Sequence, residues 1–242
     1  MADKRGRPIN WSLVMAALGG MIVGAAVLQL ASGGLAGGRT QTEAIVHDYI
    51  LSHPEILPEA MKRLQAKETG QLVASNQSAL ETPFHGAWAG AETGDVTLVM
   101  FSDYSCGFCR ASLADVDRLL ATDKKLKVVW REIPILGPGS EAAARAALAA
   151  AQQGRYLDFH RRMFTDGTPD QANIARVQQA TGVTASADAD GAITREIENN
   201  LALARTLNMT GTPTFVIGDK ILQGAVGYKA LKDAIDEARK AT

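Results

Sequence analysis

The sequence has 242 residues, of which 46% are hydrophobic and 21% are charged, so it is long and apolar enough to bury a substantial core. Its formal net charge of -1 at pH 7 excludes the strongly basic surface that is typical of nucleic-acid-binding proteins. Its two cysteines cannot form the multi-bridge framework of a small disulfide-rich protein, so the chain has to be stabilised by packing.

Residues 1–40 are typical of a targeting segment. Lys4, Arg5 and Arg7 precede Trp11–Leu30, a stretch without a charged residue. About twenty mostly apolar residues suffice to cross a bilayer, and basic residues ahead of them predict a cytoplasmic N-terminus with the rest of the chain outside. The length of the stretch favours a retained anchor followed by a glycine-rich tether, although Gly34-Leu35-Ala36 leaves a cleaved export signal open.

Residues 41–82 predict a helical arm ahead of the main domain. Thr40-Gln41-Thr42-Glu43 and Ser52-His53-Pro54-Glu55 both have the spacing of a capping box, so two helices are expected. Apolar residues recur at helical intervals along one face of each helix: Ile45, Tyr49 and Ile50, then Ile56, Leu57, Met61 and Leu64. These faces need a cover. Packing on the chain's own domain and self-association through residues 41–80 both stay open.

Residues 83–242 carry the pattern of an α/β domain. Phe84–Trp88 predicts a short strand, and the apolar run Leu98–Phe101 predicts a buried central strand. The only cysteines, Cys106 and Cys109, follow this run and open an amphipathic helix. Their spacing puts the two sulfurs one helical turn apart on one face, close enough to form a disulfide. The order of strand, Cys-x-x-Cys and helix is typical of a redox site.

The positions of the two sulfurs predict different roles. Unpaired N–H groups and the dipole at a helix start favour the thiolate of Cys106, which is the expected nucleophile, while Cys109 lies deeper and resolves the mixed disulfide. Gly107 leaves the approach open, and Phe108 supplies an apolar neighbour. Asp103 stands three residues before Cys106. It is a candidate proton relay for Cys109 or a pin for the loop, and a capping or solvated role is an equal alternative.

The rest of the domain alternates between strands and helices. Leu126–Ile133 predicts a strand parallel to the central one, because a helix of about fifteen residues connects the two by a right-handed crossover. Residues 140–209 predict an inserted set of helices, in which His160, beside two arginines, is expected at the surface. Three more elements close the domain: strands at 215–218 and 220–223 and an amphipathic helix at 227–240.

Cys106-Gly107-Phe108-Cys109, taken with Thr212-Pro213, resembles the active site of thioredoxin-fold thiol:disulfide oxidoreductases. From about Thr42 onward the chain resembles the bacterial DsbA-type branch, and within it the suppressor of copper sensitivity protein C group. The resemblance implies a thioredoxin-like fold with a helical insertion and an oligomerising N-terminal segment. It also implies a cis bond before Pro213, where sequence alone favours trans, and a platform of Thr212 and Pro213 that pairs with substrate. In these families an acid beneath the active site often does the proton work, but Met100, which stands at the position expected for it, is not acidic.

Together these features predict a periplasmic thiol:disulfide oxidoreductase, either an oxidase or an isomerase. It is expected to act on cysteines of exported proteins, to exchange electrons with a membrane redox partner, and to need no cofactor beyond the Cys106-Cys109 disulfide. Two alternatives stay open: a dedicated reductase in cytochrome c or cuproenzyme maturation, and a copper-binding module, since soft thiolates suit Cu(I). No zinc site is expected, because the four histidines are scattered without paired spacing.

Overall fold

The structure of the protein is a computed structural model that describes residues 11–184, 188 and 190–241. The basic residues expected ahead of the apolar stretch, at positions 4–7, lie outside these residues. The chain divides into two compact units, Met1–Arg63 and Leu64–Thr242. The boundary falls within helix α2 (Ile56–Ser75), whereas the sequence suggested boundaries near residues 40 and 82.

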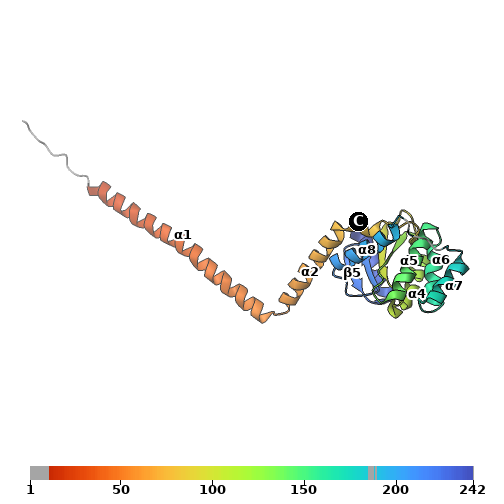
Figure 1. The fold of residues 1–242 in the computed structure, drawn as a ribbon. Helices are drawn as coiled ribbons and strands as arrows, with labels where there is room; N and C mark the ends of the chain where they lie inside the picture. The colour runs from red at the N-terminus through yellow and green to blue at the C-terminus, as the bar shows by residue number, and fades with distance from the viewer. Residues whose placement is uncertain (1–10, 185–187, 189, 242) are drawn as a thin grey trace, which may run out of the picture. The chain divides into compact units, whose positions relative to one another are not determined.

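The first unit contains helix α1 (Trp11–Ser52) and the beginning of α2 (Figure 1). Its backbone is helical through residues 31–40, where the sequence suggested a tether. No helix in the described part of the chain is both long enough and apolar enough to cross a membrane. Ile45 and Met61 are among the apolar side chains that are exposed.

The second unit is built on a five-stranded mixed sheet with the order β1-β3-β2-β4-β5. The strands are β1 (Trp88–Gly90), β2 (Val96–Ser102), β3 (Leu126–Glu132), β4 (Thr214–Ile217) and β5 (Lys220–Gln223). β2 lies parallel to β3 and antiparallel to β4, so the predicted crossover pair is confirmed. The strand predicted at residues 84–88 lies at 88–90 instead, because these residues pair with Lys127–Val129 of β3.

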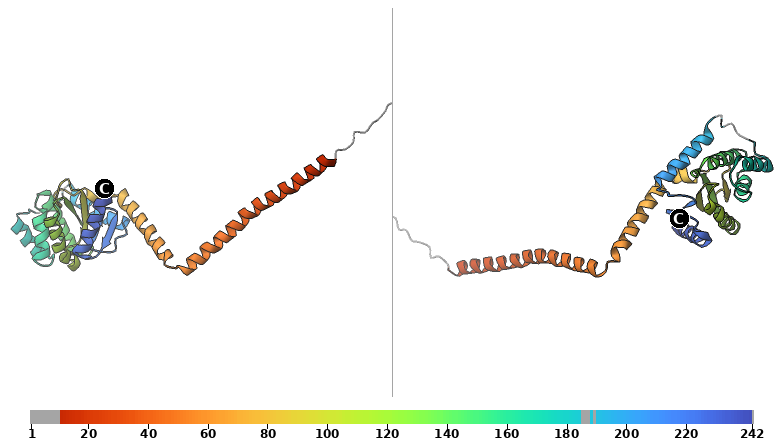
Figure 2. Two further views of the ribbon diagram at one scale, coloured as in Figure 1. Left: turned by 180° about the vertical axis from the view of Figure 1, so that it is seen from behind. Right: turned by 60° about the horizontal axis from the view of Figure 1, so that its bottom comes forward.

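Helices cover both faces of this sheet (Figure 2). The helices that follow α2 in this unit are α3 (Gln77–Glu81), α4 (Gly107–Thr122), α5 (Pro138–Gln152), α6 (Tyr156–Thr165), α7 (Gln171–Thr181), α8 (Ala192–Thr206) and α9 (Gly227–Ala241). Leu98 and Met100 of β2 point to the face that packs against α4, α5, α6 and α9. Val99 and Phe101 point to the other face, against α3 and α8. Burial of alternate residues on opposite faces is typical of a central strand, and the whole is a thioredoxin-like fold.

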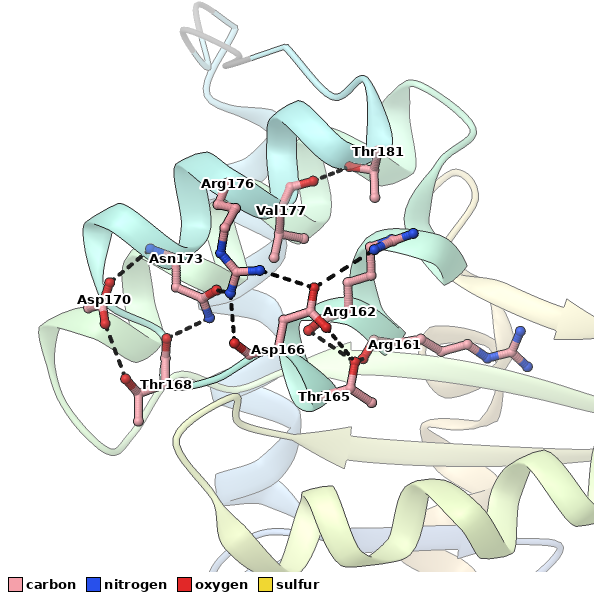
Figure 3. A network of polar contacts seen from close by, with 10 residues as sticks. All are labelled: Arg161, Arg162, Thr165, Asp166, Thr168, Asp170, Asn173, Arg176, Val177 and Thr181. Carbon is pink, nitrogen blue, oxygen red and sulfur yellow. Dashed lines mark hydrogen bonds and ion pairs between the residues drawn. The ribbon is translucent and has the colours of Figure 1, made fainter.

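The helices α5 to α8 form the insertion between β3 and β4, as predicted for residues 140–209. A polar network holds the corner between α6 and α7 (Figure 3). Arg176 donates to the carbonyl oxygen of Asp166 at 2.7 Å, and its guanidinium lies 3.6 Å from the Asp166 carboxylate. Arg110 of α4 donates to the Gly167 carbonyl at 2.8 Å. The insertion is therefore tied to the helix that begins at the cysteines.

A buried arginine joins the sheet to the helices on one face. Arg131 of β3 is 4% exposed, and its guanidinium pairs with Glu196 of α8 at 2.7 Å. It also donates to three carbonyl oxygens, those of Ala79, Leu80 and Thr82. Burial lowers the pKa of Arg131, and the charge of Glu196 acts against that shift. The guanidinium therefore stays buried at low cost only because it has these partners.

Replacing Arg131 by alanine should lower the free energy of unfolding by about 3–5 kcal/mol, because Glu196 and the three carbonyl groups lose their donor. The loss is measured as a lower urea midpoint. The control is Lys229→Ala, whose ion pair with Asp233 is exposed, and exposed pairs contribute little. Equal midpoints for the two variants would contradict this role of Arg131.

Candidate active site

The two cysteines lie at the start of α4, as the motif predicted, and both are free thiols. Cys106 is the N-cap residue, and its Sγ accepts a hydrogen bond from the Cys109 backbone N–H at 3.4 Å. An N–H group in the first helical turn has no partner within the helix, so it is available to stabilise a thiolate. Cys106 is less accessible than the sequence suggested, since it is 7% exposed and Cys109 is 0% exposed.

The loop before β4 meets the cysteines. The Thr212-Pro213 peptide bond is cis, as the resemblance implied. The Cys106 thiol donates to the Thr212 carbonyl oxygen at 3.2 Å. The pairing of β2 with β4, in which Phe101 stands opposite Thr214, brings the end of one strand to the start of the other. Cys106, Thr212 and Pro213 therefore belong to one site, although they are far apart in the sequence.

Residues 103–106 form the turn that leads from β2 into α4, which we call the cysteine turn. Asp103 is buried between this turn and two other segments, with 1% of its surface exposed. Its Oδ1 accepts hydrogen bonds from the Ser105 N–H at 2.7 Å and the Ser140 hydroxyl at 2.6 Å. Its Oδ2 accepts from the N–H groups of Ile135 at 2.8 Å and Leu136 at 3.0 Å. Among the described residues, no hydrogen bond joins this carboxylate to either sulfur. Its contacts are those of a residue that pins a loop, one of the roles that the sequence left open.

Exposed apolar side chains lie around this turn. Phe108, between the cysteines, is 68% exposed, and a Cβ at Gly107 would meet no atom within 4 Å beyond its chain neighbours. Ile135 and Leu136, whose backbone is held by Asp103, are 48% and 52% exposed. In the described chain after residue 80, these three are the large apolar side chains that are exposed. Sequence reasoning missed Ile135 and Leu136, although two apolar residues in a loop rich in glycine and proline were the available signal.

Burial makes the two thiols chemically different. It raises the pKa of Cys109 well above the ordinary value, and a hydrogen bond with the Asp103 backbone acts in the opposite direction without offsetting it. A thiol with a raised pKa stays protonated at neutral pH and does not act as a nucleophile. Cys109 is therefore the less reactive of the two sulfurs as long as Cys106 has not formed a mixed disulfide with a substrate.

A buried polar cluster lies beneath the turn and was missed by sequence reasoning. The Tyr104 and Tyr156 hydroxyls donate to Glu132 Oε1 at 2.9 and 2.5 Å. The Nδ1 of His160 lies 2.9 and 3.2 Å from the same hydroxyl oxygens, within hydrogen-bond distance of both. His160 is 0% exposed, so its predicted surface position is wrong: the aromatic side of α6 faces the sheet. Burial is the largest cause that raises the pKa values of both tyrosines, and the charge of Glu132 raises them further.

Both units are similar to known families. The family model described as DSBA-like thioredoxin domain matches residues 97–236. The model described as Copper resistance protein ScsC N-terminal domain matches residues 39–70. Among curated proteins, the chain aligns with the Na(+)/H(+) antiporter NhaA 1 of Salinispora arenicola at 27% identity over 158 residues, which are 62% of this chain and 24% of the antiporter. The chain thus spans about a quarter of the length of that relative.

Solved structures match most of the second unit. A thioredoxin-like oxidoreductase from Silicibacter pomeroyi is 41% identical, with 64% of this chain and 92% of that chain covered and a TM-score of 0.62. The catalytic domain of Proteus mirabilis ScsC is 28% identical, with 71% and 98% covered and a TM-score of 0.65. The thiol-disulfide exchange protein alpha-DsbA2 from Wolbachia pipientis is 30% identical, with 72% and 97% covered and a TM-score of 0.67.

Iodoacetamide at neutral pH should alkylate the reduced, folded protein at Cys106 and leave Cys109 unmodified, because burial keeps the Cys109 thiol protonated and covered. Peptide mass spectrometry identifies the modified residue. In Cys106→Ser the rate should fall by more than about tenfold, whereas urea should make both cysteines of the unaltered chain reactive. Equal labelling of the two sulfurs in the folded protein would contradict the difference.

Proposed function

Because the chain belongs to the DSBA-like thioredoxin domain family, we propose that it exchanges disulfides with cysteines of other, exported proteins. The observation that carries the proposal is the contact of 3.2 Å between the Cys106 sulfur and the Thr212 carbonyl oxygen. A substrate strand that pairs with the backbone at Thr212 has its own sulfur next to Cys106. Thr212 and Pro213 are therefore assigned to substrate binding and the two cysteines to catalysis.

In the reducing direction, the Cys106 thiolate attacks one sulfur of a substrate disulfide. A mixed disulfide forms, and the other substrate sulfur leaves as a thiolate. Cys109 then attacks the Cys106 sulfur, its proton passes to the departed thiolate, and the second substrate thiolate is released as the Cys106-Cys109 disulfide closes. Two electrons pass from the protein to the substrate. In the oxidising direction the same steps run backward.

The surface around the sulfur favours incompletely folded proteins as substrates. Phe108, Ile135 and Leu136 are exposed, and no charged side chain separates the two cysteines. Chains that have not yet folded expose both cysteines and apolar residues, and such chains also offer an extended backbone to Thr212. A folded substrate with a buried disulfide offers neither.

The chemistry fits a compartment outside the cytoplasm. A lone Cys-x-x-Cys pair donates or shuffles disulfides usefully where the surroundings are oxidising, and the uncharged residues 11–30 behind a basic segment support export to the periplasm. Each net oxidation or reduction of a substrate leaves the cysteine pair in the opposite redox state. A redox protein of the membrane returns the pair to its starting redox state, and no organic cofactor takes part.

The N-terminal unit is assigned to self-association. Ile45, Tyr49, Leu57 and Met61 are between 53% and 71% exposed, and apolar faces of this kind need a partner. A second copy of the same arm is a partner with a matching face, and the match of residues 39–70 to the ScsC N-terminal model supports it. Several active sites in one assembly favour the shuffling of disulfides over their simple donation.

Cys109→Ala should trap mixed disulfides through Cys106, because the resolving sulfur is gone. Trapped partners are identified by non-reducing electrophoresis and mass spectrometry of the exported fraction. Many different partners are expected, and Cys106→Ala, the matched control, should trap none.

Other outcomes of the same experiment decide between the alternatives. A single trapped apoprotein would replace this proposal with a dedicated reductase. Binding of Cu(I) by the purified chain, without any trapped partner, would replace it with a copper-binding module.

Removing residues up to Arg63 should lower the mass that light scattering reports, because the exposed arm faces are lost. A longer deletion, to Leu80, would also remove core residues such as Val73 and Leu80, which are 4% and 1% exposed, and so would test folding instead. In the full chain, Met61→Glu should lower the mass as well, while Lys62→Glu should not. An unchanged mass in both the deletion and Met61→Glu would refute self-association through the arm.

A further inference from the structure

Asp103 contacts the cysteine turn with both its side chain and its backbone. Its carbonyl oxygen accepts the Cys106 N–H at 3.0 Å. Its backbone also forms the hydrogen bond with Cys109 that opposes the effect of burial on that thiol. One residue therefore has backbone contacts to both cysteines, so any movement of Asp103 moves the groups around both sulfurs.

The carboxylate determines where this backbone lies. It accepts four hydrogen bonds of 2.6 to 3.0 Å, from Ser105, Ser140, Ile135 and Leu136. These donors belong to three segments: the turn itself, the loop after β3, and the first turn of α5. Hydrogen bonds to an ionised acceptor are about twice as strong as neutral ones. The turn therefore cannot shift without breaking bonds to two neighbouring segments.

The carboxylate is buried without a counter-charge. Within the described part of the chain no basic side chain pairs with it, and only 1% of its surface is exposed. A buried carboxylate is costly unless donors surround it, and here backbone N–H groups and one hydroxyl supply them. A second contact, between the Ser105 and Ser140 hydroxyls at 2.7 Å, links the same segments.

We propose that Asp103 is a positioning residue, whose carboxylate holds the cysteine turn in the geometry that stabilises the thiolate. The inference deepens the proposed function and rests on it. It differs from the proton-relay role, because all four contacts of the carboxylate are to groups that hold the backbone in place.

Three roles of Asp103 predict three different results for Asp103→Asn. The amide has the same shape, but its NH₂ group faces two donors, so the turn loosens. If Asp103 positions the turn, the thiolate loses stabilisation, so alkylation at acidic pH slows and the reduction potential becomes more negative. If its charge mattered directly, removal of a neighbouring anion would favour the thiolate and move both quantities the other way. If it relayed a proton, only the resolution of the mixed disulfide would slow.

The experiment measures the alkylation rate of the reduced full chain as a function of pH, together with the redox equilibrium against glutathione. We expect alkylation of Asp103→Asn at acidic pH to slow by about threefold or more, with a lower potential. The control is Asp117→Asn in helix α4, whose carboxylate contacts Arg161 at 2.6 Å and is 37% exposed, and it should change neither quantity. Faster alkylation, a higher potential or no change in Asp103→Asn would overturn the proposal.

A second variant keeps the test valid if Asp103→Asn does not fold. Ser140→Ala removes one of the four donors and should shift both quantities in the same direction by less, while Ser140→Thr, which keeps the hydroxyl, should restore them. A Ser140→Ala variant with an unchanged alkylation rate and an unchanged reduction potential would then overturn the proposal. Failure of the proposed function is seen separately: the wild-type chain would exchange no disulfide with a cysteine peptide, although its own sulfurs still titrate.

Discussion

The site depends on the antiparallel pairing of β2 with β4. Phe101 stands opposite Thr214 in this pairing, so the residues that follow β2 and those that precede β4 emerge at the same edge of the sheet. The Cys106 sulfur thus reaches the Thr212 carbonyl oxygen, 106 residues along the chain. A shift of this register by one residue would turn the buried side chains of β4 to the opposite face and separate the two halves of the site.

Each residue of the turn between β2 and α4 has a side-chain contact to another segment of the chain. The Asp103 carboxylate binds the loop after β3 and α5, and the Tyr104 hydroxyl binds Glu132 beneath the turn. Ser105 contacts Ser140, and Cys106 contacts Thr212. The turn is therefore fixed on several sides by polar groups, so the Cys106 sulfur is held by a structured support.

The two units contribute different parts of the proposed function. The second unit contains the two sulfurs, the Thr212 backbone proposed to bind substrate and the exposed apolar residues beside them, and no described residue before Leu64 belongs to its core clusters. The first unit exposes apolar faces that only another surface can cover. Under the proposed function, catalysis belongs to the second unit and self-association to the first.

The sequence by itself determined the local features, because each depends on neighbours along the chain. The Cys106-Cys109 spacing at a helix start, the parallel β2 and β3 pair and the insertion of helices all follow from apolar periodicity and motif spacing. The tertiary structure alone decided which distant groups meet. It buried His160 with Glu132 and two tyrosines, and it surrounded Asp103 with four donors. Contacts of this kind have no period in the sequence, since they arise where packed elements place polar groups in a space that water cannot reach.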